Sequence, residues 1–412
     1  MSKFILIIKL SLKNFQESCF RYLFKINNVP TFYFIIKILE ILKFTKFKVS
    51  KLNSSFILSK YNNYLNNILR AQPVIQDKSN KISGDIYHNK TNVSLGIFVL
   101  KNNDVNLTYE IFSDLFQSFQ KHIAPYVVLD EFGSVLSASS KYLESLNFRN
   151  IEEISSFDKV LIFFEANSTK FNYVQFLHKS KKPNLKFIII CFDLWRDFDF
   201  QRIQSWRNHK DVTFLHMDDS LTKIDGFDMQ KFYNWIYVGF HEKLPHTQKK
   251  RSFFWSGGAK SHERKIWLLY FKYLACKFKI KSEVLIVNYQ KPKTRISRTQ
   301  YLENLASNQY CFSLTAKSAD KTLTTFRAIE ILSLGSTLVH QEFHNHHPLR
   351  EKFVPFLHYL PFQSIEELAI IFKLISERSE LLEKISLQAF NYWNSNFSAA
   401  KRWHDLIMKV SE

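Results

Sequence analysis

The chain contains little glycine and little cysteine. Only 8 of its 412 residues are Gly, so a glycine-rich phosphate loop is essentially excluded and phosphate binding would depend on side chains and helix N-termini. The four cysteines stand far apart without a CxxC pair, which excludes a disulfide framework or a zinc site and fits a reducing cytosol. They are Cys19, Cys191, Cys276 and Cys311.

Long apolar runs are also absent. The N-terminal stretch FILIIKLSL is interrupted by Lys9 and lacks a small-residue cleavage site, so no signal peptide is expected. The longest uncharged run near the N-terminus, residues 26–36, contains Pro30 and is too short to span a bilayer. We predict no transmembrane segment and a cytoplasmic localisation. Neither a P-loop nor a G-x-S-x-G, H-E-x-x-H or kinase signature occurs.

Positive charge is abundant. The net charge is +20, and half of this excess lies in residues 1–80, which hold 13 Lys and Arg against three acidic residues. Such a bias fits an anionic substrate, an anionic membrane surface or nucleic acid. A skewed genome composition that enriches lysine throughout is the alternative source. Because the basic residues are spread out and no nucleic-acid module is present, no nucleic-acid partner is expected.

The N-terminal part differs from the rest. Residues 1–75 interleave aromatic residues with lysines and predict a basic helical extension, and the polar residues 76–92 indicate a linker. One interpretation places the extension peripherally on the inner face of an anionic membrane. The other makes it an appendage that packs its apolar side chains against the first domain.

Short apolar runs alternate with amphipathic helical stretches after the linker. The near-continuous hydrophobicity of these runs predicts strands buried on both faces, as in parallel sheets covered by helices. The alternation occurs in two blocks, residues 93–243 and 252–395, and a helical tail follows over 396–412. We therefore predict an α/β fold of two doubly wound Rossmann-like domains with an N-terminal helical extension. The expected strands are 93–100, 126–129, 159–165, 186–192, 212–217, 252–257, 283–288, 310–315, 336–340 and 357–361, and the expected helices are 108–122, 262–276, 297–307, 324–334, 364–375 and 379–394.

Residues 310–339 are the most informative for function. They predict a strand, a polar loop that holds Lys317 and Lys321, and a helix that holds Arg327 and Glu330. The lysines offer positive charge to phosphates, and a helical carboxylate can accept hydrogen bonds from sugar hydroxyls. This combination fits a nucleotide-sugar site.

The C-terminal block resembles the second domain of GT-B glycosyltransferases, especially exostosin-like and related group 1 enzymes. The similar segments are FFWSGGAKSHERKIWLLYFKYL, YLENLASNQYCFSLTAKSADKTLTTFRAIEILSLGSTLV, with its R-x-x-E-x-L-x-x-G pattern, and YLPFQSIEELAIIF. The resemblance covers about residues 250–395. It implies transfer of a sugar from a nucleotide diphosphate sugar to a saccharide acceptor, in surface polysaccharide or lipopolysaccharide synthesis and without a bound metal.

Two glycines and an arginine follow the first strand of this block. Gly257 and Gly258 end the strand, where glycine permits close approach of the backbone to a ligand. The resemblance implies that Arg264 binds the donor diphosphate, which suits a bidentate guanidinium. The alternative is an exposed helical arginine paired with Glu263.

The loop and helix of residues 315–334 supply the remaining donor-binding candidates. Lys317 and Lys321 would neutralise the diphosphate leaving group, or they are solvated loop lysines. Thr325 would donate to a phosphate or cap the helix, as would Thr322. Arg327 and Glu330 share a helix face. The resemblance implies that Glu330 binds ribose hydroxyls, and the alternative is an ion pair with Arg327. Gly335 predicts the end of the helix.

The first domain is expected to bind the acceptor and to supply any general base. Four acidic residues follow its predicted strands, at the edge where ligands of such sheets bind. They are Asp130, Glu131, Glu165 and Asp193. Helix capping is the alternative for each of them.

A metal site is not expected. His344, His346 and His347 have neither the spacing of a helical pair nor a nearby cysteine, so a loop beside the donor site is the preferred interpretation. Two other functions remain open: a nucleic-acid-binding protein that relies on the positive charge, and an α/β scaffold without catalytic activity.

Overall fold

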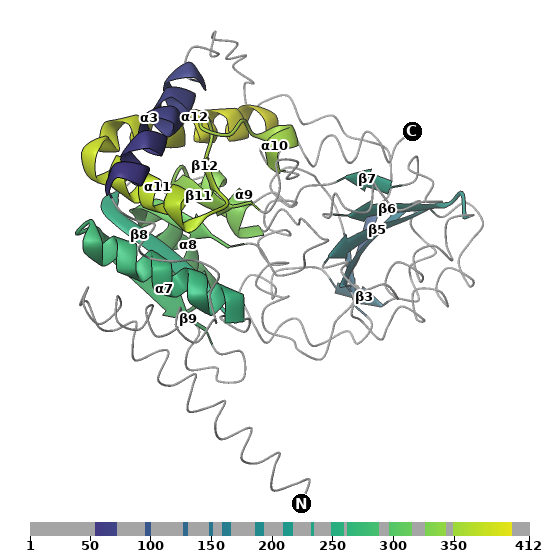
Figure 1. Ribbon diagram of the computed structural model, residues 1–412. Helices are drawn as coiled ribbons and strands as arrows, with labels where there is room; N and C mark the ends of the chain where they lie inside the picture. Colours follow the sequence, from purple (N-terminus) through teal and green to yellow (C-terminus); the bar gives the residue numbers. More distant parts are fainter. Residues whose placement is uncertain are drawn as a thin grey trace, which may run out of the picture.

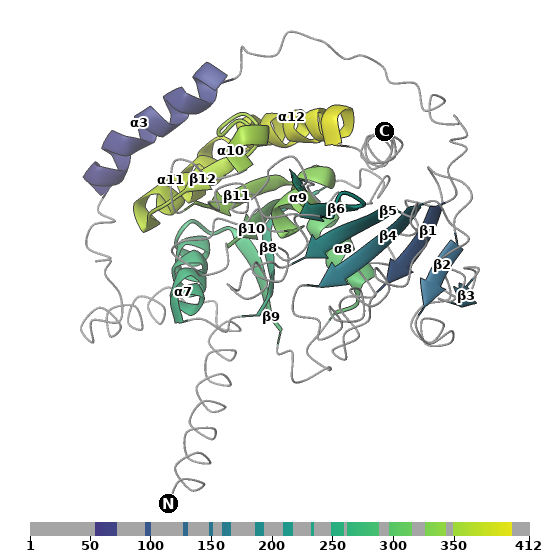
Figure 2. The same cartoon turned by 90° about the vertical axis from the view of Figure 1, so that its right-hand side faces the viewer.

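The described elements form two lobes, each built on its own β-sheet (Figures 1 and 2). The predicted helix 108–122 and most of the predicted tail 396–412 lie outside the described residues. The computed structural model describes residues 54–71, 95–99, 127–130, 148–150, 159–165, 186–192, 209–216, 232–234, 249–258, 262–287, 296–314, 326–342 and 349–397.

The first lobe contains a seven-stranded parallel sheet in the order β3-β2-β1-β4-β5-β6-β7. The five strands expected from apolar runs are confirmed to within about three residues at each end. The sequence does not predict β3 and β7, because each has three residues and leaves no apolar run to detect. The strands are β1 (Leu95–Val99), β2 (Val127–Asp130), β3 (Phe148–Asn150), β4 (Lys159–Glu165), β5 (Lys186–Phe192), β6 (Val212–His216) and β7 (Phe232–Asn234).

The second lobe contains a five-stranded parallel sheet in the order β12-β11-β10-β8-β9. Phe253, Phe254 and Trp255 of β8 are fully buried, so the strand is covered on both faces, as its unbroken apolar run predicts. The two parallel sheets confirm the predicted α/β fold class. The strands are β8 (Lys250–Gly257), β9 (Lys281–Ile286), β10 (Asn308–Ser313), β11 (Thr337–Gln341) and β12 (Leu360–Phe362).

Helices cover both faces of the second sheet. On one face Phe271 of α7 and Phe372 of α11 contact Phe253. On the other face Tyr301 of α8 contacts Phe254, because successive strand residues point to opposite faces. The helices of this lobe are α7 (His262–Lys277), α8 (Arg298–Ser307), α9 (Phe326–Ser333), α10 (Leu349–Lys352), α11 (Ile365–Glu377) and α12 (Ser379–Phe397).

Gly335 ends α9, as the sequence predicts. Its backbone has a φ of 67°, a left-handed conformation that glycine adopts without the steric cost of a Cβ. The amide of Ser336 donates to the carbonyl of Ile331, and that of Gly335 donates to Leu332. This Schellman arrangement satisfies the last carbonyls of α9 and turns the chain directly into β11.

One helix of the N-terminal extension belongs to the second lobe. In α3 (Ser54–Ala71) the side chains of Tyr61, Tyr64 and Ile68 are buried in the core of that lobe, and α3 lies alongside α11 (Figure 1). The interpretation that the extension packs against the first domain is therefore wrong for this helix. Residues 1–53 lie outside the described part of the chain.

Candidate functional site

The order of the second sheet creates a topological switch point at the carboxyl ends of β8 and β10, which is where doubly wound sheets have their ligand crevice. The chain leaves β8 for β9 on one side and returns to β10 on the other, so the connections that follow β8 and β10 diverge. In doubly wound sheets this switch point is where ligands bind. Both α7 and α9 begin at this edge, since each follows one of these two strands, and a helix N-terminus favours the binding of an anion.

Arg264 lies in the first turn of α7, next to the end of β8. Its Nη1 donates to the carbonyl oxygen of Gly258 over 2.9 Å. The guanidinium is thereby fixed against the two-glycine turn. The structure thus brings Arg264, Gly257 and Gly258 together, as the sequence predicts.

Arg327 reaches the same turn from the first turn of α9. Its Cζ lies 5.3 Å from the centre of the Trp255 ring, a cation–π contact. A Cβ at residue 257 would lie 2.8 Å from the Arg327 Nη2 atom, so a side chain at this position would displace the guanidinium. The Nε atom of Arg327 is buried and has no hydrogen-bond partner among the described residues.

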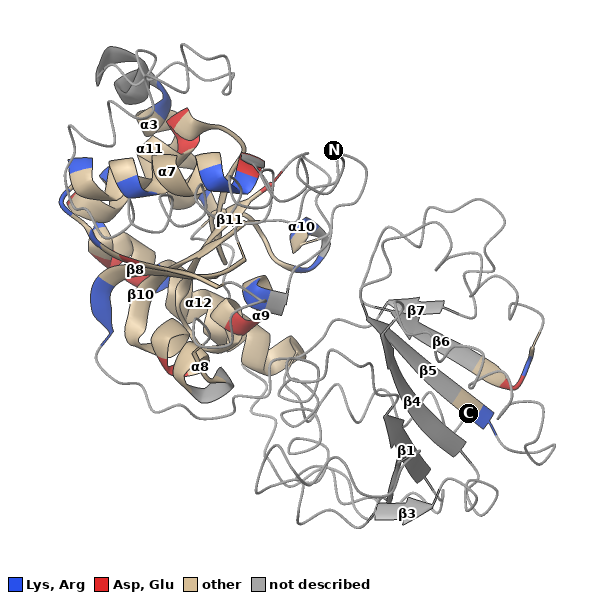
Figure 3. Cartoon of the chain, turned by 90° about the horizontal axis from the view of Figure 1, so that it is seen from below, with Lys and Arg blue, Asp and Glu red and all other residues tan. Residues whose placement is uncertain are grey.

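Both arginines lie in the first turn of a helix. Helix N-termini carry partial positive charge and are stabilised by anions. The first turn of α9 nevertheless holds Arg327 and no acidic residue, and the first turn of α7 holds Arg264 beside Glu263. Figure 3 shows basic residues on α7, α9 and α10 of this lobe. Two guanidinium groups at one switch point favour the binding of a phosphate-containing ligand.

Glu330 lies one turn after Arg327 but does not pair with it. Among the described residues no ion pair joins the two, because Arg327 lies over Trp255 instead. The Glu330 side chain is 3% exposed, and its Oε2 accepts a hydrogen bond of 3.0 Å from the Tyr301 hydroxyl of α8. The alternative of an ion pair with Arg327 is therefore wrong. The sequence gives no functional signal for Tyr301, because it shows only that this residue lies in a helix.

The other predicted site residues are placed only in part. Lys317, Lys321 and Thr325 lie outside the described residues, as do Glu131 and Asp193. In the first sheet, two of the candidate bases end strands at the carboxyl edge. Asp130 is the last residue of β2, and Glu165 is the last residue of β4, which borders the switch point between β1 and β4.

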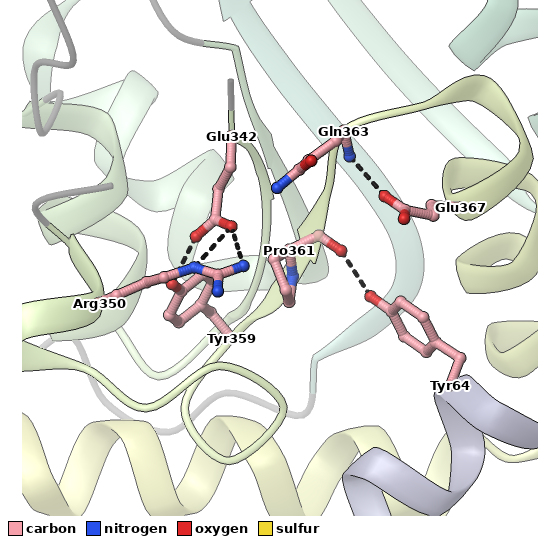
Figure 4. Close-up of polar contacts among 7 residues, drawn as sticks. All are labelled: Tyr64, Glu342, Arg350, Tyr359, Pro361, Gln363 and Glu367. Atoms are coloured by element: carbon pink, nitrogen blue, oxygen red, sulfur yellow. Dashed lines mark hydrogen bonds and ion pairs between the residues drawn. The ribbon is translucent and has the colours of Figure 1, made fainter. Parts of the chain in front are cut away.

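A second polar cluster lies at the carboxyl end of β11. The Glu342 side chain is fully buried. Its Oε2 accepts from Nε and Nη2 of Arg350 at 2.9 and 2.6 Å, and its Oε1 accepts from the Tyr359 hydroxyl at 2.6 Å (Figure 4). Burial and the carboxylate raise the pKa of Tyr359. The sequence gives no signal for this cluster, because its members come from three separate elements.

The described residues contain neither a membrane-spanning helix nor a metal-binding cluster. None of the helices there is both long and apolar enough to cross a membrane. Likewise, no group of three or more His, Cys, Asp or Glu side chains in this part of the chain is arranged to hold a metal ion. The histidines at 344, 346 and 347 fall outside it.

Comparisons with known proteins show similarity at the level of structure. No protein-family model and no curated protein sequence matches the chain. An alpha-glucosyltransferase in complex with UDP and a 13-mer DNA is 10% identical, with a TM-score of 0.50 over 78% of this chain and 100% of that chain. A glycosyltransferase from Rickettsia africae is 9% identical, with a TM-score of 0.48 over 78% and 99%. The lipopolysaccharide outer core galactosyltransferase WaaB is 10% identical, with a TM-score of 0.47 over 77% and 99%.

At such identities the similarity concerns the fold alone. The alpha-glucosyltransferase is matched over its whole length and over 78% of this chain. The two parallel sheets, with their switch points, are those of a doubly wound two-domain protein. The chain has the GT-B glycosyltransferase fold, which is the fold that its C-terminal motifs imply.

Proposed function

We propose that this protein is a glycosyltransferase that moves a sugar from a nucleotide diphosphate sugar to a saccharide acceptor. The observation that carries the proposal is the convergence of Arg264 and Arg327 on the end of β8, where Gly257 leaves room for one guanidinium. A diphosphate is the anion that two such groups at one switch point fit best.

The chemistry of the donor site follows from its charges. When the glycosidic bond to the donor breaks, negative charge develops on the diphosphate, and fixed cations stabilise it. Arg264 and Arg327 supply such cations, and Lys317 and Lys321 are proposed to add to them, with Thr325 as a further donor. We expect no metal requirement, because side chains would carry this role. Glu330 is proposed to accept hydrogen bonds from the ribose hydroxyls, with the Tyr301 bond fixing its carboxylate.

The acceptor is assigned to the first domain. The general base that would deprotonate its hydroxyl is proposed among Asp130, Glu131 and Asp193, since an inverting reaction requires one. The R-x-x-E-x-L-x-x-G pattern that ends at Gly335 supports an exostosin-like or group 1 type. A role in surface polysaccharide or lipopolysaccharide synthesis follows from the same resemblance.

A peripheral membrane contact is proposed for the N-terminal extension, residues 1–75. The apolar face of α3 packs inside the second lobe, and its exposed residues include Asn62, Asn63 and Asn66. The face that carries Tyr61, Tyr64 and Ile68 is therefore not available to a bilayer, whereas Leu69 of the same helix is 51% exposed. The scattered cysteines suit a cytosolic enzyme.

Binding of nucleotide sugars tests the proposal. Thermal-shift screening with UDP-, GDP- and ADP-sugars should show that one class stabilises the wild type, whereas CMP-sugars, which lack a diphosphate, should not. Arg327→Met should weaken that ligand about 100-fold, the loss of one charge-assisted contact of roughly 3 kcal/mol. Release of nucleoside diphosphate should then depend on an added saccharide acceptor.

Arg251→Met is the matched control. Arg251 is 71% exposed at the opposite edge of the sheet, so its loss should leave binding unchanged. No stabilisation by any nucleotide sugar would contradict the proposal, as would equal losses in both variants. Salt-dependent binding of a DNA duplex without nucleotide-sugar binding would favour the nucleic-acid alternative.

A further inference from the structure

α3 makes specific contacts with the edge of the second sheet. The Tyr64 hydroxyl donates to the carbonyl oxygen of Pro361 over 2.7 Å, in a buried hydrogen bond (Figure 4). The ring of Tyr64 meets that of Phe356 edge-on at 4.7 Å. Pro361 lies in β12, which pairs with β11 on one side only. α3 therefore covers an edge strand whose outward carbonyl would otherwise lack a partner.

The bond to Pro361 is the first step of a continuous polar path. The next residue, Phe362, accepts a hydrogen bond of 2.9 Å from the backbone amide of Glu342. The Glu342 carboxylate in turn holds Arg350 and Tyr359. The path leads from α3 through β12 to the carboxyl end of β11. β11 pairs directly with β10, which borders the crevice of the candidate donor site.

The start of α11 is fixed at the same place. The amide of Gln363 donates to the Glu367 carboxylate over 2.6 Å, and the amide of Glu367 donates to the Ser364 hydroxyl over 3.2 Å. This pair is a variant of the capping box in which the Glu367 carboxylate accepts from the residue before the N-cap Ser364. Burial and the carboxylates of Glu367 and Glu342 raise the pKa of Tyr64 well above its ordinary value, so its hydroxyl keeps the proton that it donates.

We propose that Tyr64 is a positioning residue of the donor site. Through Pro361 it fixes β12, and with β12 the Glu342 cluster at the carboxyl edge, so that docking of α3 favours the arrangement that binds the donor. The inference rests on the proposed function, because it concerns the same site. If docking of α3 and donor binding are coupled, each strengthens the other to the same extent.

The same helix supplies a matched control. Tyr61 is as buried as Tyr64, but it contacts the far end of α11. Its ring lies 4.7 Å from Lys373 Nζ, and its hydroxyl interacts with Glu377 and Arg378. Tyr61→Phe and Tyr64→Phe therefore remove one hydroxyl each from the same interface, and only Tyr64 is linked to the carboxyl edge.

The experiment compares both full-length variants with the wild type. Calorimetry should give the Kd of whichever of UDP, GDP and ADP stabilises the wild type. We expect Tyr64→Phe to raise this Kd about fivefold and Tyr61→Phe to change it less than twofold. By reciprocity, the bound nucleotide should slow hydrogen exchange in α3 of the wild type. Equal losses of affinity in both variants, or none in either, would overturn the positioning role and leave the donor site standing.

Hydrogen exchange without ligand separates this inference from the proposed function. Tyr64→Phe should speed exchange of the Glu342 amide, whose bond to Phe362 closes the path, while Tyr61→Phe should not. A wild type that binds no nucleotide would contradict the proposed function. In that case unchanged protection of Glu342 in Tyr64→Phe would overturn the positioning role as well, and faster exchange would support the path itself.

Discussion

A cation lies at each end of the strands of the second sheet, and the two cations differ in their hydrogen-bond partners. At the amino edge Lys249 donates to the carbonyls of Ala306 and Leu334 at 2.8 and 2.9 Å and to the Ser336 hydroxyl at 2.9 Å. At the carboxyl edge Arg327 lies over an indole ring, and its buried Nε has no hydrogen-bond partner among the described residues. All three N–H donors of Lys249 have acceptors, whereas the Nε donor of Arg327 has none among the described residues.

Helix direction explains this difference. The carbonyls that bind Lys249 are at the C-terminal ends of α8 and α9, where partial negative charge favours a cation. Arg327 stands in the first turn of α9, where the same dipole disfavours one. Burial lowers the pKa of Lys249 to about 8, although its three oxygen partners favour the charged form. Lys249 thus stabilises the fold, whereas Arg327 is proposed to bind an anion.

The contribution of the buried His358 to the free energy of unfolding can be tested by changing the pH. His358 is 4% exposed, its Nδ1 accepts from the amide of Val354 over 3.0 Å, and its ring stacks on Tyr392 at 4.4 Å. Burial lowers the pKa of His358 from 6.5 to about 4. The unfolded chain therefore takes up more protons between pH 6.5 and 4, and the free energy of unfolding should fall by about 3 kcal/mol across this window.

Chemical denaturation at pH 7 and pH 4 would measure this loss. His358→Gln keeps a neutral acceptor for Val354 and removes the titrating group, so the variant should lose about 3 kcal/mol less than the wild type over the same interval. Other carboxyl groups titrate in both proteins and cancel in the difference. An equal loss in both would show that His358 does not need to be neutral for folding.

Much of the second domain could be predicted from sequence because its signals are local. The run that contains Phe253, Phe254 and Trp255 identifies β8, and Gly335 identifies the end of α9. Placing Arg264 at the turn after β8 needs only the strand-turn-helix order. These elements follow from residues that are neighbours in the chain.

The contacts that the sequence does not reveal join distant residues. α3 docks through Tyr64 on Pro361, 297 residues away. Arg327 contacts Trp255 rather than Glu330. The fold places the end of β8, which holds Trp255, beside the first turn of α9. Helical spacing predicts which residues share a face, but it does not show what the tertiary structure places opposite that face.

Substitution of the two cations by methionine tests the comparison directly. Lys249→Met removes a cation from two helix C-termini and leaves Ala306 O and Leu334 O without this donor, which should lower the free energy of unfolding by about 2 kcal/mol. Arg327→Met should change it by less than about 0.5 kcal/mol in the absence of ligand, since it removes a cation from an unfavourable place. Denaturant titration of both variants would measure the two effects. If Arg327→Met destabilised the protein as much as Lys249→Met, Arg327 would be a structural residue rather than part of an anion site.

Gly257→Ala should have a small effect on stability and a selective effect on nucleotide binding. The added Cβ would lie 2.8 Å from Arg327 Nη2 and 3.2 Å from the nearest atom of Trp255. The end of a flexible arginine can move aside, but the Gly257 φ of 159° is one that L side chains rarely adopt, so the free energy of unfolding should fall by about 1 kcal/mol. The displaced guanidinium would no longer lie at the crevice, and nucleotide affinity should fall about tenfold, or 1.4 kcal/mol. Calorimetric titration of the Arg327→Met, Gly257→Ala double variant separates the causes: if Gly257 acts through Arg327, adding the alanine should cost no further affinity. A second tenfold loss would mean that the glycine itself contacts the ligand.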